Sequence, residues 1–174
     1  MIDINLDELN LTNVEKDALK VYSFDSNSFN IPFRDNPMKL IDELENLIDN
    51  VSYERIRTLN SLMSGLKNEI VLYRGLKNFS TDDFKVGAVF HNIGGFQSSS
   101  SKISVARKYA GDNGIVLIIK AITGTKCLCM GKYSTNPYDE EFLLDYLYDY
   151  IPYKIDKETK DVYVNLKLKD IPEV

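Results

Sequence analysis

An arginine lies within a short apolar run of the sequence, in the segment IVLYRGL at residues 70–76. The run is rich in residues that favour strands. An unpaired guanidinium is costly to bury. Arg74 therefore either reaches solvent or a structural carboxylate from the end of a strand, or it points into a cleft. In a cleft its planar fork fits a phosphate or a carboxylate, and Gly75 would let a ligand approach the backbone closely.

Four serines stand in a row behind an aromatic residue, in the segment FQSSSSKISVARKYA at residues 96–110. If this stretch is extended, Ser98 and Ser100 share one face and Ser99 points the other way. Serine clusters commonly form a solvated strand edge or a turn in which hydroxyls bond the backbone. The alternative is that one hydroxyl orients a neighbouring carboxylate for chemistry.

Three acids precede an apolar run in the segment DEEFLL at residues 139–144. In a strand, Asp139 and Glu141 would point together and Glu140 would point away. An acidic trio before a strand usually forms a solvated turn. Two carboxylates on one face of a cleft would instead raise each other's pKa and could divide the roles of acid and base between them.

The periodicity of apolar residues divides the chain into a helical part, residues 1–68, and a β-rich part, residues 69–174. The expected elements are, in order, a helix opening near Thr12, a loop over 23–37, helices over 38–50 and 53–66, a strand over 114–122 and a hairpin over 153–169. We expect a single α+β domain over residues 1–174, with helices packed on a strongly bent or double sheet.

The bulk composition limits the possible functions. A chain of 174 residues with 44% hydrophobic residues favours one globular domain. The net charge of −5 makes nucleic acid an unfavourable partner. The lone His91 and the pair Cys127 and Cys129 give neither a metal site nor a His-based triad. We therefore expect no metal, and we interpret the cysteines as packing residues.

The sequence shows neither a signal peptide nor a membrane span. Its start, MIDINLDELN, is acidic, and no apolar run is long enough to cross a bilayer. A P-loop and a Rossmann glycine fingerprint are also missing. We expect a protein that is cytoplasmic as synthesised and has no membrane partner, with delivery into a host cell by another route left open.

The three segments, in this order, resemble the motifs of the mono-ADP-ribosyltransferases of the arginine–serine–glutamate clade. LYRG resembles the first motif, FQSSSSKISVARKYA the second and DEEFLL the third. The segments EKDALKVY and FNIPFR resemble the first helix and the Asn-x-x-Leu-Arg segment of this clade. The resemblance spans roughly residues 12–168. The clade includes enzymatic components of clostridial binary toxins, exoenzyme-type toxins and phage enzymes.

This resemblance implies an ADP-ribosyltransferase-like fold with a two-sheet mixed or antiparallel β core, and an enzyme that uses NAD as its substrate. Such enzymes cleave the bond between nicotinamide and ribose and pass ADP-ribose to a target protein. By resemblance, Glu141 binds the ribose 2′-hydroxyl, Ser98 holds Glu141 in place, and Arg74 clamps the NAD phosphates or the adjoining ribose. Gly75 offers its backbone to the nicotinamide amide. Tyr109 stacks on the nicotinamide ring, where the family usually has Phe.

Asp139 departs from the family pattern, which has Glu here in members that modify arginine and Gln in several that modify other acceptors. Asp keeps a charge that favours a cationic arginine acceptor, but it is one methylene shorter than Glu. The preceding loop, GKYSTNPY at residues 131–138, corresponds to a target-recognition loop. Tyr133 and Tyr138 are its candidate aromatic residues, although neither sits clearly in the expected place.

Three functions stay open at this level. The first is an active enzyme that modifies a protein, with arginine the favoured acceptor, working as a toxin-type or phage effector. The second is a binding module that kept the fold, lost turnover and inhibits a partner protein. The third is an enzyme whose acceptor is a nucleotide, a nucleic acid or another small molecule. NAD hydrolysis should accompany the first and third functions and be absent from the second.

Overall fold

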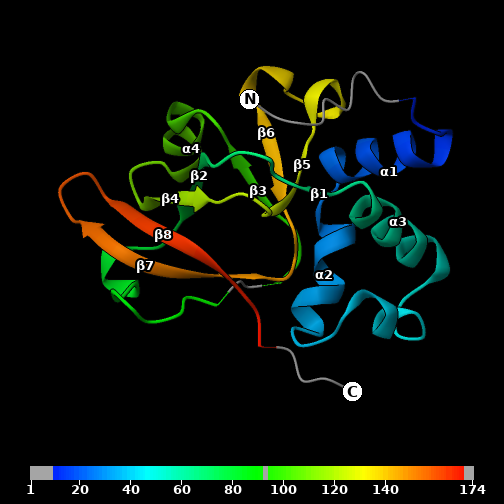
Figure 1. The fold of residues 1–174 in the computed structure, drawn as a ribbon, viewed down its shortest axis with the longest axis horizontal. Coiled ribbons are helices and arrows are strands. Elements are labelled where there is room, and N and C mark those ends of the chain that lie inside the picture. Colours follow the sequence, from blue (N-terminus) through cyan, green and yellow to red (C-terminus); the bar gives the residue numbers. More distant parts are fainter. Residues whose placement is uncertain (1–9, 92–93, 171–174) are drawn as a thin grey trace.

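The computed structural model describes residues 10–91 and 94–170, so most of the acidic start and the two residues after His91 lie outside the described part. Helices gather at the beginning of the chain and strands follow (Figure 1). The elements are α1 (Asn13–Phe24), α2 (Asn27–Asp35), η2 (Ile41–Leu44), α3 (Asn50–Ser61), β1 (Ser64–Gly65), β2 (Ile70–Lys77), η3 (Thr81–Asp83), β3 (Gln97–Ser100), α4 (Ile103–Ala110), β4 (Gly114–Ala121), β5 (Lys126–Cys129), η4 (Gly131–Tyr133), η5 (Pro137–Asp139), β6 (Glu141–Leu144), β7 (Tyr148–Asp156) and β8 (Asp161–Leu168), where η denotes a short 3₁₀ helix.

Helix α1 begins at a capping box formed by Thr12 and Glu15. The backbone N–H of Thr12 donates to Glu15 Oε1 at 2.9 Å, and the backbone N–H of Glu15 donates to Thr12 Oγ1 at 3.2 Å. These bonds satisfy two N–H groups that have no partner within the helix. The predicted helix start near Thr12 is confirmed.

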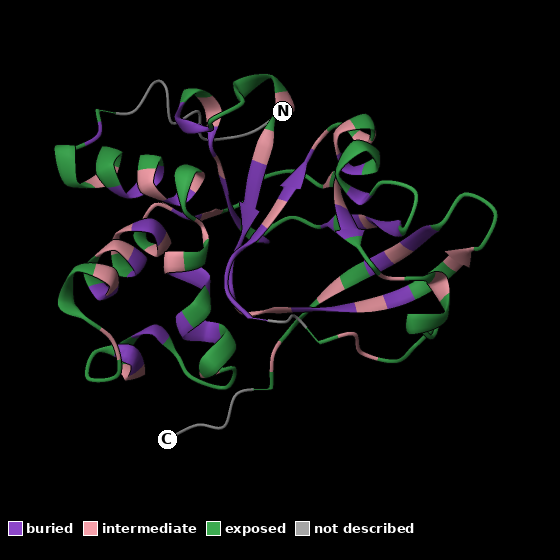
Figure 2. Ribbon diagram, turned by 180° about the vertical axis from the view of Figure 1, so that it is seen from behind, coloured by how far each residue is buried: buried purple, intermediate pink, exposed green. Residues whose placement is uncertain are grey.

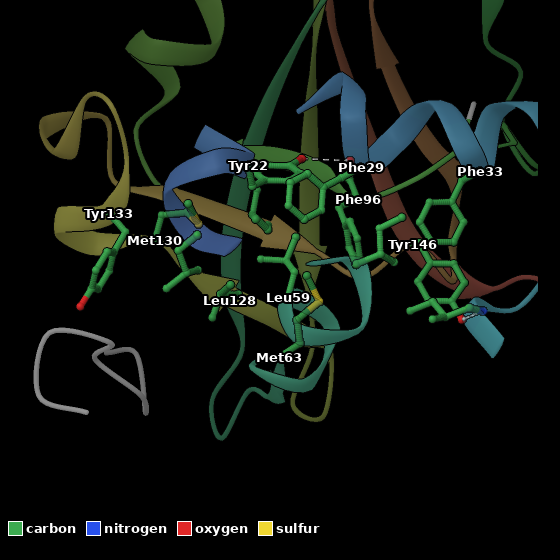
Figure 3. Packing of buried hydrophobic residues seen from close by; sticks show 14 of the residues in the cluster. Tyr22, Phe29, Phe33, Leu59, Met63, Phe96, Leu128, Met130, Tyr133 and Tyr146 are labelled. Atoms are coloured by element: carbon green, nitrogen blue, oxygen red, sulfur yellow. Dashed lines mark hydrogen bonds between the residues drawn. The ribbon is translucent and has the colours of Figure 1, made fainter. Parts of the chain in front are cut away.

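The prediction of a loop over residues 23–37 is wrong, because α2 occupies most of this segment. Phe29 and Phe33 are buried on α2, and Phe33 stacks on Tyr146 with ring centroids 4.6 Å apart (Figure 3). Burial of two aromatic rings outweighs the cost of Pro32 inside the helix and the weak helix preference of the Asn and Ser residues.

Residues 38–50 also differ from the prediction, since they form η2 and a turn instead of one long α-helix. Ile41 and Leu44 are buried, but Leu47 on the same predicted stripe is 54% exposed. A short helix is stable only where its apolar face packs against something. Here one turn supplies the fully buried residues. Beyond it, Ile48 is partly buried against the hydrophobic core while Leu47 faces solvent, so the stripe is not buried along its whole length.

The eight described strands form one sheet in the order β1-β5-β6-β3-β2-β4-β8-β7. β4 and β8 run parallel, and the other pairings among the described strands are antiparallel. In Figure 1, β7 and β8 run across the direction of β6, so the sheet bends strongly. The α+β class and the closing hairpin are confirmed. The described strands form one continuous bent sheet, as the sequence pattern allowed, whereas the resemblance implied a core of two sheets.

Two large clusters of buried side chains, among the three that the described residues form, join the helices and the strands. Leu143 on β6 belongs to the cluster beneath α1, α2 and α3, whereas Phe142 and Leu144 belong to a second cluster with β2, β4 and β8. Because neighbouring residues of a strand point to opposite faces, the two clusters lie on opposite sides of β6. Figure 2 shows the buried faces of the helices turned toward the sheet. Cys127 lies in the second cluster and Cys129 packs against it, as expected for packing residues.

Candidate active site

A cavity of about 490 Å³ is lined by residues of α1, α2, β2, β3, α4 and the segment from 134 to 141. This volume is in the range that binds small molecules and cofactors in proteins. Each site residue predicted from the sequence lines this cavity: Arg74, Gly75, Ser98, Tyr109, Asp139 and Glu141. The fold therefore brings the three sequence motifs to one place.

Arg74 is held at the cavity wall by a backbone carbonyl of the serine strand. Its Nη1 donates to Ser98 O at 2.6 Å, and the side chain is partly buried. β2 supplies this position because it is a central strand, paired with β3 on one side and β4 on the other. Of the alternatives left by the sequence, the structure places Arg74 at a cleft, beside Ser98.

The serine strand β3 pairs antiparallel with β6, with Ser98 opposite Leu143 and Ser100 opposite Glu141. Beyond the ladder, the serine hydroxyls bind the acidic segment. Ser99 Oγ donates to Phe142 O at 3.1 Å, Ser100 Oγ donates to Asp139 O, and Ser101 Oγ donates to Glu140 Oε2 at 2.6 Å. The hydroxyls of the serine run thus hold the acidic segment in place through hydrogen bonds, and the run is not a solvated strand edge.

Glu141 opens β6 at the cavity wall, and its surroundings favour the protonated form more than water does. Burial raises the pKa of Glu141 above the ordinary glutamate value, and the negative charge of Asp139 raises it further. Hydrogen bonds from Ser98 and Ser134 and the positive charge of Arg74 act in the opposite direction. A carboxylate with a raised pKa in a cleft is typical of a functional site.

Asp139 lines the cavity from a short 3₁₀ helix, η5, and not from a strand as expected. It ends η5, and Glu140 after it adopts a left-handed conformation with φ of 48°, so the strand begins only at Glu141. The prediction that Asp139 and Glu141 share one face of a strand is therefore wrong. The left-handed residue turns the chain, and both carboxylates still line the same cavity.

Gly75 lacks a side chain for a reason that the sequence did not reveal. A Cβ placed there would lie 2.2 Å from Ala106 O and 2.8 Å from Ala110 N, both on α4. Helix α4 therefore packs directly on the backbone of β2. Arg107 on α4 adds a second attachment, with Nη1 and Nη2 at 3.0 and 2.9 Å from the two carboxylate oxygens of the buried Asp161 on β8.

Gly75→Ala is expected to lower the free energy of unfolding by about 2–3 kcal/mol, because the added methyl group overpacks the contact between β2 and α4. Urea denaturation would measure this loss. Val71→Thr on an exposed position of the same strand serves as the control and should change stability by less than about 0.5 kcal/mol. A Gly75→Ala variant as stable as the wild type would show that α4 does not depend on this close approach.

Two tyrosines lie in exposed positions near the cavity, and a third is buried. Tyr109 lines the cavity from α4, is 59% exposed, and has Lys77 Nζ at 4.6 Å from its ring centroid. Tyr138 in η5 is 84% exposed, whereas Tyr133 is buried in the first cluster. Of the two aromatic candidates in the loop, only Tyr138 is therefore exposed.

The cavity wall also contains residues of the two N-terminal helices that were not among the predicted site residues, namely Tyr22, Asn30 and Arg34. Asn30 bonds both backbone groups of Phe96, accepting from its N–H at 2.9 Å and donating to its C=O at 3.2 Å. The buried Tyr22 hydroxyl lies 3.5 Å from Phe96 O (Figure 3). The FNIPFR segment signalled Asn30 and Arg34. Nothing in the local sequence signalled Ser134, which also lines the cavity.

The chain is similar to known proteins both in sequence and in structure. Residues 42–172 match the sequence model of the family described as NAD:arginine ADP-ribosyltransferase. A sequence comparison with curated proteins found no match. No helix within residues 10–91 and 94–170 has the length and apolarity that a bilayer crossing requires.

Several solved structures share the fold. A C3-type ADP-ribosyltransferase from Clostridium botulinum has a TM-score of 0.69 and 19% identity, covering 94% of this chain and 90% of that one. C3stau2 from S. aureus with NAD has a TM-score of 0.71 and 15% identity, covering 94% and 91%. Plx2a, an ADP-ribosyltransferase toxin from Paenibacillus larvae, has a TM-score of 0.69 and 15% identity, covering 92% and 88%.

The family match spans most of the chain, and the fold is that of known ADP-ribosyltransferases. The chain therefore belongs to the NAD:arginine ADP-ribosyltransferase family and is an enzyme that uses NAD as its substrate.

Proposed function

We propose that this enzyme transfers a single ADP-ribose from NAD to an arginine side chain of a target protein. The observation that carries the proposal is the pair of carboxylates, Asp139 and Glu141, on the wall of one cavity. Their charges are close enough for Asp139 to raise the pKa of Glu141. Two anionic groups suit both a cationic acceptor and a transition state with positive charge on the ribose.

In the proposed reaction the bond between ribose C1′ and the nicotinamide nitrogen breaks, and its electron pair leaves with neutral nicotinamide. The ribose then carries oxocarbenium character, which the carboxylate of Glu141 stabilises while it binds the 2′-hydroxyl. A lone pair on a guanidinium nitrogen of the acceptor forms the new bond to C1′. Asp139 takes the proton that this nitrogen loses.

The remaining cavity residues receive roles that fit their positions. Arg74 is fixed by Ser98 O through Nη1, and its guanidinium suits the diphosphate of NAD. Tyr109 is exposed at the cavity and presents a ring on which nicotinamide can stack. Ser98 is assigned to Glu141, because its hydrogen bond lowers the pKa of that carboxyl.

We also propose that the helical part and the β-rich part act as one catalytic domain over residues 1–174. The support is that α1 and α2 contribute Tyr22, Asn30 and Arg34 to the cavity wall. The first hydrophobic cluster likewise contains residues of both parts. A β-rich part without the helices would therefore lack one wall of the site.

The proposed setting is that of a toxin-type effector, made in the cytoplasm of a bacterium and delivered into another cell. The similarity in fold to Plx2a, which is described as a toxin, supports this setting. A phage effector that acts in the cell where it is made is the alternative suggested by the sequence resemblance.

The function is tested by incubating the purified chain with labelled NAD and polyarginine, and separately with bacterial and eukaryotic lysates. Mass spectrometry should find ADP-ribose on arginine side chains. A matched reaction with polylysine should stay unlabelled, because a lysine ammonium lacks the planar fork of a guanidinium. NAD hydrolysis without an acceptor should be measurable by release of nicotinamide.

Each result separates the functions that the sequence left open. Label on asparagine or on a nucleotide would overturn arginine as the acceptor but keep the enzyme. A folded chain that binds NAD and releases no nicotinamide would overturn the proposal in favour of a binding module.

A further inference from the structure

We propose that Ser134 is a positioning residue that holds the carboxylate of Glu141 from the side of the loop, as Ser98 holds it from the side of the sheet. This inference rests on the proposed function, in which Glu141 stabilises the transition state. Ser134 Oγ donates to Glu141 Oε1 at 3.2 Å, and the serine is only 9% exposed.

A backbone hydrogen bond orients the hydroxyl of Ser134. The backbone N–H of Asn136 donates to Ser134 Oγ at 3.2 Å, which occupies a lone pair of the oxygen. The hydroxyl has a single proton to donate, and with this lone pair engaged the proton lies toward Glu141. The serine thus acts as an oriented donor to the carboxylate and not as a freely rotating hydroxyl.

The backbone around Ser134 is anchored on both sides. The N–H of Ser134 donates to Gly131 O at 3.2 Å, and the N–H of Thr135 donates to Ser23 Oγ on α1 at 2.6 Å. Tyr133 just before it is buried in the first cluster. The donor to Glu141 is therefore fixed by groups of the loop, the core and α1 together.

The hydrogen bond from Ser134 links the loop that carries the acceptor-side residues to the carboxylate that is proposed to bind the ribose. Ser134 begins the segment that carries the exposed Tyr138 and then Asp139, the residue assigned to the acceptor. A shift of this segment would move the Ser134 hydroxyl and loosen the carboxylate that contacts NAD. The charged groups that act on Glu141 are Arg74 from β2 and Asp139 from η5. Replacing Ser134 changes neither of these charges.

The test is the variant Ser134→Ala, with Ser134→Thr as the variant that restores the hydroxyl. For Ser134→Ala we expect kcat of NAD hydrolysis to fall about tenfold, as for loss of a hydrogen bond to a charged group, while KM for NAD changes less than about twofold. Ser134→Thr should keep most of the wild-type kcat. Ser104→Ala on the exposed face of α4 is the control and should behave as the wild type.

A second measurement needs no turnover. Carbon-13 NMR of glutamate-labelled protein reports the pKa of each glutamate, and Glu141→Gln identifies the Glu141 signal. Because the Ser134 hydrogen bond lowers the pKa of Glu141, Ser134→Ala should raise it and Ser134→Thr should leave it near the wild-type value. Thermal unfolding of each variant verifies that it is folded.

The kinetic measurement and the NMR titration together distinguish failure of the role of Ser134 from failure of the proposed function. A Ser134→Ala variant with unchanged kcat and an unchanged Glu141 pKa would overturn the role of Ser134. A wild-type chain that releases no nicotinamide would overturn the proposed function, while the NMR arm would still decide whether Ser134 holds Glu141.

Discussion

Glu141→Gln is expected to lower the rates of NAD hydrolysis and of ADP-ribose transfer about 100- to 1000-fold or more, as for loss of a well-placed electrostatic contact. The substitution keeps the shape of the side chain and removes the negative charge that opposes the developing positive charge on the ribose. NAD affinity measured by calorimetry should change much less than kcat, because that charge develops only in the transition state.

Glu140→Gln supplies a matched control for this prediction. Glu140 is the neighbouring acid, is exposed, and accepts its hydrogen bond from Ser101 on the outside of the cavity wall. Gln keeps an oxygen that can accept the same bond, so both activities should stay within about twofold of the wild type. Equal losses in Glu140→Gln and Glu141→Gln would show that the wrong acid had been assigned to the ribose.

The wild-type activity should also depend on pH in a direction that the structure fixes. In the proposed reaction the carboxylate of Glu141 works when ionised, and burial raises its pKa above the ordinary value. Activity should therefore decline as the pH falls through this raised pKa, at a higher pH than for an ordinary exposed glutamate.

Asp139→Ala is expected to reduce ADP-ribose transfer to polyarginine about 100-fold, since a general base commonly contributes this much. NAD hydrolysis should change less than about threefold, because water as the acceptor does not need the charge that attracts a guanidinium. The measurement is the ratio of transferred ADP-ribose to released nicotinamide in one reaction. Asp139→Glu, which keeps the charge on a side chain one methylene longer, should keep or increase that ratio.

Comparable losses of hydrolysis and transfer in Asp139→Ala would remove this residue from the acceptor side of the site. That result would indicate that Asp139 supports the cleavage of NAD itself, as a second negative charge near the positive charge that develops on the ribose. In either case the Glu141 titration in Asp139→Ala should show a lowered pKa, because the neighbouring negative charge is gone.

The extent to which the fold followed from the sequence differs between the two halves of the chain. The strands β2, β4, β7 and β8 were predictable because their apolar runs and turn residues are local signals. The segment 23–37 was not, since the burial of Phe29 and Phe33 against residues far along the chain outweighs its Asn, Ser and Pro content. For 38–50, the amphipathic pattern was present but only part of its stripe is buried, since Leu47 is exposed while Ile48 packs against the core.

The candidate site shows the same division. The types and order of Arg74, Ser98 and Glu141 could be read from the sequence, because a guanidinium, a hydroxyl and a carboxylate each carry their chemistry in the side chain. The reason for Gly75 could not, since it depends on α4 lying directly on β2. Nor could the part of Ser134, whose hydroxyl reaches Glu141 only through the turn around Asn136.

The sequence by itself determined which chemical groups this protein has and that Arg74 stands in a strand, because residue type and periodicity are properties of short segments. Only the tertiary structure decided how those groups meet: that the serine run holds the acidic segment, that the helices wall the cavity, and that Asp139 enters by a turn. The physical reason is that these contacts join residues distant in the chain, and their energies depend on the packing of the whole sheet and its helices.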